Sequence, residues 1–261
     1  MITQREISKL AFQLKMSDRV IEKDYVLTWI LLGVAESDLY KHLAFKGGTA
    51  LKKAYFPDYR YSEDLDFTLI KGMDSESLLS HLQRVLDALS RSQGFQFDIP
   101  PERIEHHTDG VTIYVSFVGP LQAKLGSRDI TLSEKILFPI ESRPIHCIYS
   151  DAVKQQIRTY SLEEILVEKL CAIIGRTEPR DVYDADFLFE QNLDFLAIPN
   201  AFLEKAKFKG VSSNRLREVL ERKKPVSERM WKIRLVHQVK DLPHFEEVLR
   251  NLQRNLKKYM D

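Results

Sequence analysis

Two adjacent glycines, Gly47 and Gly48, interrupt the chain between an apolar run at 43–46 and a helical pattern at 49–55. A backbone without Cβ atoms can turn sharply and can approach phosphate oxygens closely. A helix that begins directly after such a turn presents free N–H groups and the positive end of its dipole to an anion. The sequence therefore predicts a strand, a glycine turn and a helix in succession, with the hydroxyl of Thr49 as a further donor at the turn.

A second strand is expected at 65–69, where apolar and polar residues alternate. Alternation places the side chains of Asp64 and Asp66 on one face and those of Leu65 and Phe67 on the other. Two neighbouring carboxylates repel each other, whereas two Mg²⁺ ions about 3.5 to 4 Å apart would neutralise them and grip a phosphoryl group. The glycine turn and the acidic strand together predict a metal and nucleotide site. The alternative is a tight turn beside an exposed acidic edge strand.

Strands are predicted only in the first two thirds of the chain, and helices throughout. The expected helices lie near 17–36, 74–91, 161–174, 179–190, 199–208, 212–223, 226–238 and 243–259, and the other β-rich runs are 111–117, 129–132 and 145–149. This pattern predicts an α+β fold, with a mixed sheet flanked by helices and a C-terminal helical lobe. We expect two domains, 1–155 and 156–261.

The composition is that of a soluble globular protein, with 261 residues, of which 44% are hydrophobic and 30% charged. The uncharged run at 25–35 falls short of the roughly 20 residues that span a bilayer. The amino terminus lacks the pattern of a secretory signal. Two cysteines and seven scattered histidines offer no zinc cluster. We therefore expect a cytoplasmic protein without membrane association.

The net charge of +1 conceals an uneven distribution. Residues 201–261 carry 16 Lys and Arg against 8 Asp and Glu, whereas residues 1–200 carry 23 against 30. A basic lobe attracts polyanions, because each neutralised phosphate releases counterions. The alternative interpretation is an ordinary solvated helical surface.

The motif Gly47-Gly48-Thr49, followed after fourteen residues by Asp64-Leu65-Asp66, closely resembles that of the AbiEii/AbiGii toxin family of nucleotidyltransferases. This family belongs to the DNA polymerase β-like superfamily. The resemblance covers roughly residues 17–195 and extends to these segments: Glu22-Lys23-Asp24-Tyr25, Tyr61-Ser62-Glu63, Glu168-Lys169-Leu170, Arg176 and Arg180-Asp181-Val182-Tyr183-Asp184.

The resemblance implies a nucleotidyltransferase fold in which Asp64 and Asp66 hold catalytic Mg²⁺, two ions being expected, and a third carboxylate lies on a neighbouring strand. Our candidate for the third is Asp129, which opens a run similar to the carboxylate strand of the family. Glu134 is the second choice, and a surface loop acid is the alternative for it. Gly47, Gly48 and Thr49 are expected to bind the phosphates of a nucleoside triphosphate (NTP).

Lys169 lies on the apolar face of its expected helix, so it must either extend to solvent or reach into a polar cleft. The resemblance gives it a catalytic or nucleotide-binding part, and gives Asp181 an active-site role. Arg176 and Arg180 are candidates for phosphate binding, or they form a supporting network of salt bridges with the acids of 181–184. For Asp184 we favour the supporting role.

The family resemblance points to a toxin of a toxin-antitoxin or abortive-infection system that transfers NMP from an NTP to RNA. The expected acceptor is the 3′ end of tRNA, which would block translation, and a cognate antitoxin protein is the expected partner. Two alternatives stay open: transfer to a protein or small-molecule hydroxyl, and a non-catalytic nucleotide-binding regulator.

Two further features have simple interpretations. Lys23 and Asp24 are expected to form an ion pair on the helix surface. Ser62 would share the face of Asp64 if the acidic strand extends back that far, and a phosphate there would then compete for Mg²⁺. An ordinary turn serine is the alternative.

Overall fold

The chain folds into two compact units. The structure, a computed structural model, describes residues 1–108, 110–121, 124–125, 128–131 and 134–260, with the backbone alone at 124–125 and 128–131. The first unit comprises residues 1–134 and 140–159, and the second comprises residues 135–139 and 160–261. The strand at 156–159 thus stays with the first unit, whereas the sequence-based boundary at 155 separates it.

The first unit is built on a seven-stranded mixed sheet with the order β4-β5-β8-β2-β1-β10-β9. Strand β2 at its centre runs antiparallel to β1 and parallel to β8, and β1 runs parallel to β10. The strands are β1 (Leu43–Lys46), β2 (Leu65–Leu69), β4 (Ile104–His106), β5 (Gly110–Ile113), β8 (Arg128–Thr131), β9 (Glu141–Pro144) and β10 (Gln156–Thr159). A three-stranded sheet has the order β3 (Gln96–Asp98), β6 (Ser116–Val118) and β7 (Lys124–Leu125).

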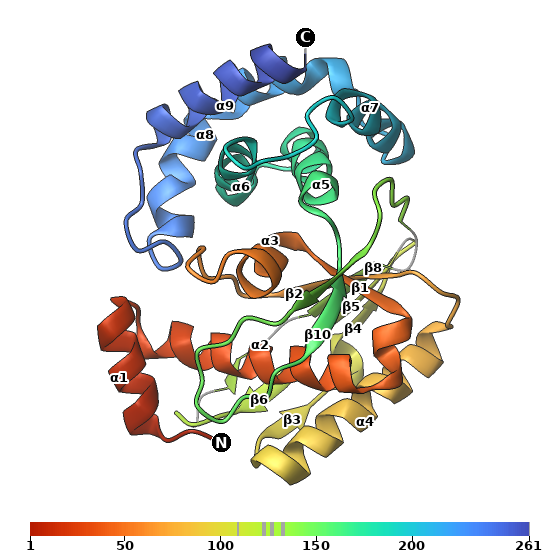
Figure 1. Cartoon of the computed structure of the whole chain (residues 1–261), viewed down its shortest axis with the longest axis vertical. Coiled ribbons are helices and arrows are strands. Elements are labelled where there is room, and N and C mark those ends of the chain that lie inside the picture. Colours follow the sequence, from red (N-terminus) through yellow and green to blue (C-terminus); the bar gives the residue numbers. More distant parts are fainter. Residues whose placement is uncertain (109, 122–123, 126–127, 132–133, 261) are drawn as a thin grey trace. The chain divides into compact units, whose positions relative to one another are not determined.

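Helices cover both faces of the larger sheet. Helix α3 (Gly47–Ala50) continues into a π-helical turn η2 (Leu51–Tyr55) and contacts β1 and β2. Figure 1 shows α2 (Asp18–Glu36) and α4 (Ser75–Gln93) on the other side of the sheet from α3. The remaining helices of this unit are α1 (Gln4–Leu14) and the 3₁₀ turns η1 (Asp38–Lys41) and η3 (Pro101–Arg103). Helix α2 is buried over most of its circumference, which makes it part of the core.

The described residues of the second unit form helices and loops, without a strand. It contains α5 (Leu162–Gly175), α6 (Pro179–Phe189), α7 (Ile198–Phe208), η4 (Ser213–Arg215), α8 (Leu216–Leu235) and α9 (Phe245–Tyr259). Helix α5 packs on α6, α7 and α8, and α9 packs on α6 and α8. Ser161 is the N-cap of α5, its hydroxyl accepting a hydrogen bond from the backbone N–H of Glu164. Figure 1 shows α8 and α9 along the outside of α6.

The predicted α+β class is confirmed, and several elements differ from the prediction. The run 111–117 is two strands in different sheets, because the chain changes partners at 114–115 while its apolar residues stay buried. No strand forms at 145–149, whereas β10 and α1 were missed. Helix α8 spans two predicted helices and continues through Pro225. Pro225 is exposed, so the carbonyl that loses its helical partner can bind water.

The predictions about Lys23 and Asp24 are wrong. Lys23 forms an ion pair with Glu63 at 3.1 Å, and Asp24 is 2% exposed and contacts Lys53. Helix α2 turns Asp24 into the core, because the neighbouring turns of the helix are buried as well. Ser62 lies before β2, which begins at Leu65, so the strand does not extend back to it.

Within the described parts of the chain, every helix is too short or too polar to cross a membrane.

Candidate active site

The turn between β1 and α3 requires glycine for two reasons. Gly47 has a φ of +77°, in the region that favours glycine. A Cβ atom at Gly47 would also collide with Oδ2 of Asp66 and would come within 3.1 Å of its Cγ. The carboxylate of Asp66 therefore occupies the space that a side chain at residue 47 would fill. The glycine bend (residues 47–49) and the acidic strand are in direct contact.

The burial of residues 64–67, at the start of β2, follows the expected alternation. Leu65 and Phe67 are buried, at 0% and 4% exposure, and Asp64 and Asp66 are half-buried. The hydroxyl of Thr49 donates a hydrogen bond to the backbone carbonyl of Asp64. Since this side chain is 1% exposed, its hydroxyl ties the bend to the start of the acidic strand.

The backbone brings the third acidic candidate beside the other two. Asp129 on β8 is the register partner of Asp66 in the parallel β2–β8 pair, although its side chain lies outside the described residues. The surface position expected as the alternative for Glu134 is wrong. Its side chain is 2% exposed and forms an ion pair with Lys46 at 3.5 Å. Lys46 on β1 is the register partner of Asp66 on β2, so it places a cation beside the acidic strand. Sequence reasoning did not identify this cation.

Lys52 secures the loop between the bend and the acidic strand. Its Nζ donates to the carbonyl oxygens of Pro57 and Tyr59, at 2.8 and 2.9 Å, and lies 4.1 Å from the ring centre of Tyr61. Burial lowers the pKa of Lys52 to about 8, against the opposing effect of nearby carboxylates. Sequence reasoning missed this lysine, because the sequence around a buried lysine in the helix after the glycine bend does not distinguish it from a lysine on the surface.

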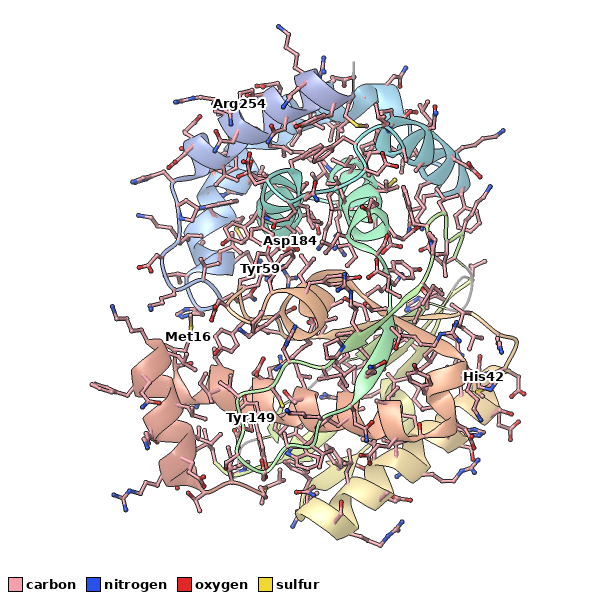
Figure 2. All side chains as sticks on the ribbon, in the orientation of Figure 1. Met16, His42, Tyr59, Tyr149, Asp184 and Arg254 are labelled. Carbon is pink, nitrogen blue, oxygen red and sulfur yellow. The ribbon has the colours of Figure 1, made fainter. Side chains whose placement is uncertain are left out.

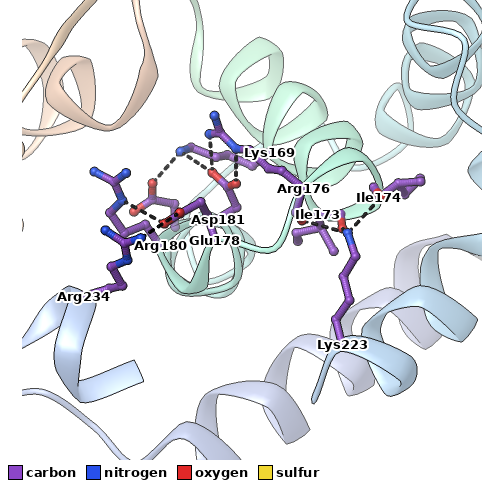
Figure 3. A network of polar contacts seen from close by, with 10 residues as sticks. Lys169, Ile173, Ile174, Arg176, Glu178, Arg180, Asp181, Lys223 and Arg234 are labelled. Atoms are coloured by element: carbon purple, nitrogen blue, oxygen red, sulfur yellow. Dashed lines mark hydrogen bonds and ion pairs between the residues drawn. The ribbon is translucent and has the colours of Figure 1, made fainter. Parts of the chain in front are cut away.

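The second unit holds a buried network centred on Lys169 of α5 (Figure 3). The Nζ of Lys169 lies 2.9 Å from Oδ1 of Asp181 and 2.8 Å from Oδ2 of Asp184. Both carboxylates come from α6, and their side chains are 1% and 0% exposed. Figure 2 labels Asp184 beside α5 and α6. Lys169 therefore does not extend to solvent but reaches inward to two acids.

Arg176 completes the network and Arg180 stays outside it. Arg176 makes two hydrogen bonds to Asp181, from Nε to Oδ2 at 2.8 Å and from Nη2 to Oδ1 at 3.1 Å. Burial raises the pKa of Asp181, but Lys169 and Arg176 outweigh it and hold the pKa below the usual value. Arg180 instead forms an ion pair with Glu178 at 3.7 Å.

Part of the basic C-terminal region serves the interior of its own unit. Lys205 is fully buried, with its Nζ 2.7 Å from Oε1 of Glu164 and 2.6 Å from the carbonyl of Lys135. Lys223 donates to the carbonyls of Ile173, Ile174 and Arg176, at 2.9, 2.9 and 2.8 Å, and so caps the end of α5 (Figure 3). Neither lysine is available to a polyanion, so the charge count overstates the basic surface.

The donor chemistry at the bend fits a hard divalent cation. Mg²⁺ takes oxygen ligands and is commonly held by one or two carboxylates together with substrate phosphates. Asp64 and Asp66 supply such oxygens, and the contact of Asp66 with Gly47 leaves no competing side chain between them and the bend. Among residues with described side chains, no group of three or more His, Cys, Asp or Glu is placed to hold a metal.

Comparison with known proteins decides the family. Residues 29–251 match a family described as nucleotidyl transferase AbiEii toxin, type IV toxin-antitoxin system. The chain belongs to the AbiEii family. It is therefore a nucleotidyltransferase toxin of a type IV toxin-antitoxin system, with an NTP as substrate and a cognate antitoxin. The match extends past residue 195, where the recognised motifs end, and includes most of the basic region.

Solved structures show the same fold. The nucleotidyltransferase toxin MenT4 from Mycobacterium tuberculosis is 16% identical with a TM-score of 0.76, and the match covers 100% of this chain and 90% of that one. JHP933 from Helicobacter pylori is 17% identical with a TM-score of 0.60, covering 94% and 93%. No curated protein matches the sequence.

Proposed function

We propose that this toxin transfers NMP from an NTP to the 3′-terminal hydroxyl of tRNA, in a Mg²⁺-dependent reaction that blocks translation. The hydroxyl oxygen attacks the α-phosphorus, a new O–P bond forms, the bond to the β-phosphate oxygen breaks, and pyrophosphate leaves. Asp64, Asp66 and Asp129 would hold Mg²⁺. When bound there, Mg²⁺ would neutralise the triphosphate and lower the pKa of the attacking hydroxyl.

The contact between Gly47 and Asp66 is the observation that carries the proposal. It joins a bend whose backbone can approach phosphates to a strand whose carboxylates can bind cations. We assign the phosphates to the backbone N–H groups of Gly48 and Thr49. The side chain of Thr49 holds the bend in place through Asp64.

In the second unit, we assign Lys169 to the negative charge that develops on the phosphates in the transition state. Its ammonium is held by Asp181 and Asp184 from one side, so its position is set before substrate binds. Asp181 is then a positioning residue that acts through Lys169. Arg176, which is 61% exposed, and Arg180 are the further candidates for phosphate contacts.

The distribution of charge on helix α9 supports the proposal of an RNA acceptor. Its apolar residues Val248, Leu249, Leu252 and Leu256 are buried, whereas Arg250, Arg254, Lys257 and Lys258 are exposed on the opposite side. Figure 2 marks Arg254 on this helix. A row of exposed cations along one helix face suits a phosphate backbone, whose binding weakens steeply with salt.

Labelled NTPs test the proposal. Each of the four α-labelled NTPs is supplied with Mg²⁺ and bulk tRNA, to the wild type and to Asp66→Ala. We expect label on tRNA with the wild type alone, and none after chelation of Mg²⁺. Asp98→Ala, which removes an exposed aspartate from β3, is the matched control and should label tRNA normally.

The same assay separates the alternatives. Bulk RNA and total protein are offered together, and label on protein rather than RNA would contradict the acceptor. Undiminished labelling by Asp66→Ala would contradict the chemistry. Binding of tRNA that does not weaken with added salt would contradict the role of α9.

A further inference from the structure

A buried polar network joins α2 to the π-helical turn that follows the glycine bend. The Asp24 network consists of Asp24, Thr28, Lys53 and Tyr149. The Nζ of Lys53 donates to Oδ2 of Asp24 at 2.7 Å and to Oγ1 of Thr28 at 2.8 Å. The hydroxyl of Tyr149 donates to the same Oδ2 at 2.6 Å. Figure 2 shows Tyr149 beside α2.

Stability alone does not account for this ion pair. Asp24 and Lys53 are each 2% exposed, and taking two charges out of water costs several kcal/mol. A well-packed apolar pair in such a place is often as stable or more stable. An ion pair of this kind differs from an apolar contact in being directional, since the hydrogen bonds to Asp24 and Thr28 set the position of Nζ against two oxygens at once.

Lys53 lies on the same helical segment as the glycine bend, so the directional contacts of its Nζ act on that segment. Helix α3 runs without a break into η2, so Gly47 and Lys53 lie on one short helical segment. Lys52 and Lys53 hold this segment on two sides, Lys52 through the loop carbonyls of Pro57 and Tyr59, and Lys53 through α2. The backbone carbonyl of Lys53 also accepts a hydrogen bond from His146 N–H at 2.7 Å.

The front of the segment needs such support. At its first residue, Gly47 packs against the carboxylate of Asp66 with no space for even a Cβ atom. A small tilt of a short helix about its far end therefore moves the N–H groups of the bend relative to Asp66. Displaced N–H groups would make longer and weaker hydrogen bonds to the oxygens of a bound phosphate.

We propose that the Asp24 network positions the glycine bend for the triphosphate, with Asp24, Lys53 and Tyr149 acting as positioning residues. The inference rests on the proposed assignment of the bend to NTP phosphates. Since the network acts on binding geometry and not on the reacting atoms, its loss should weaken NTP binding more than it slows the bound reaction.

Two tyrosines of the first unit provide a matched pair of variants. Tyr149→Phe deletes the hydroxyl that donates to Asp24, and Tyr25→Phe deletes a hydroxyl that donates to Asp151 at 2.6 Å. The two rings pack against each other, with centroids 4.8 Å apart, so both changes disturb the same core. Only Tyr149 is linked to Lys53 through Asp24.

The measurements are KM and kcat for NTP, Kd for NTP by titration calorimetry, and Tm. We expect Tyr149→Phe to raise KM and Kd at least about threefold with kcat nearly unchanged, and Lys53→Met to raise them about tenfold, in line with the loss of one or several directed contacts. Tyr25→Phe should lower Tm as much as Tyr149→Phe while leaving KM and Kd at wild-type values.

Equal KM and Kd for Tyr149→Phe and the wild type would overturn the inference, as would equal increases in the two tyrosine variants. If Lys53→Met does not fold, the tyrosine pair alone decides. Failure of the proposed function is distinguishable, because it would appear as full activity in Asp66→Ala. An inactive Asp66→Ala with an unaltered Tyr149→Phe would contradict the Asp24 network alone.

Discussion

The acidic residues of the two units differ in burial. Asp66 on β2 and Asp64, directly before this strand, are half-buried, whereas Asp181 and Asp184 on α6 are almost completely buried and bound to Lys169. A carboxylate that takes a cation from solution must stay accessible, whereas one that holds a protein cation can be enclosed, and its charge then depends on that partner. This difference in burial is the one expected if, as proposed, the carboxylates at β2 bind Mg²⁺ and those of α6 position Lys169.

The largest expected effect is that of Asp66→Asn on activity. The amide keeps the shape of the side chain but removes the charge that would bind Mg²⁺, so kcat/KM for NTP should fall by more than about 1,000-fold. The free energy of unfolding should change by less than about 1 kcal/mol, because the residue is half-buried. Steady-state kinetics and urea unfolding measure the two quantities. A tenfold loss or less would contradict the role of β2.

Asp184→Asn, in contrast, should lower the free energy of unfolding. It removes one of the two buried carboxylates that pair with Lys169, and breaking a buried pair costs about 3 kcal/mol or more. Urea unfolding should show this loss. Asp241→Asn, an exposed aspartate of the same unit, is the control and should be neutral. A loss under about 1 kcal/mol for Asp184→Asn would remove the distinction between the two regions.

The third prediction compares two buried lysines, Lys52 of the first unit and Lys169 of the second. Unlike that of Lys169, the Nζ of Lys52 binds carbonyl oxygens, and burial lowers the pKa of Lys52 from 10.5 to about 8. The unfolded chain therefore binds more protons between these values, and stability rises with pH across that window. From about pH 7.5 to about pH 9.5, the wild type should gain about 2 kcal/mol relative to Lys52→Met in urea unfolding. Parallel pH profiles of the free energy of unfolding for the wild type and Lys52→Met would contradict the lowered pKa of Lys52.

Arg176→Ala should have the smallest effect on stability. The side chain of Arg176 is 61% exposed, so its pair with Asp181 is largely screened by solvent, and its loss should cost less than about 1 kcal/mol. Thermal and urea unfolding measure the cost. A loss as large as that of Asp184→Asn would show that exposure does not separate the partners of this network.

How much of the site could be predicted depends on how local its geometry is. The first strand, the glycine turn and the alternation of the two aspartates, Asp64 and Asp66, with apolar residues follow from neighbouring residues. The structure brings these elements together. Lys46 and Glu134 were not paired in advance, because their contact depends on how β1 and the chain after β8 meet. Strand β10 was missed because Ile157 is the one apolar residue in its short run, although the strand lies between β1 and β9 in the sheet.

The sequence by itself determined the motif, the family and the α+β class, because residue type and spacing control turns, alternation and helix caps directly. Only the tertiary structure decided that Asp24 binds Lys53 and Tyr149, which lie 29 and 125 residues away along the chain. It also decided that Lys205 and Lys223 serve the interior. A charged residue has no intrinsic preference among partners, so its role depends on which oxygens the packed elements place within its reach.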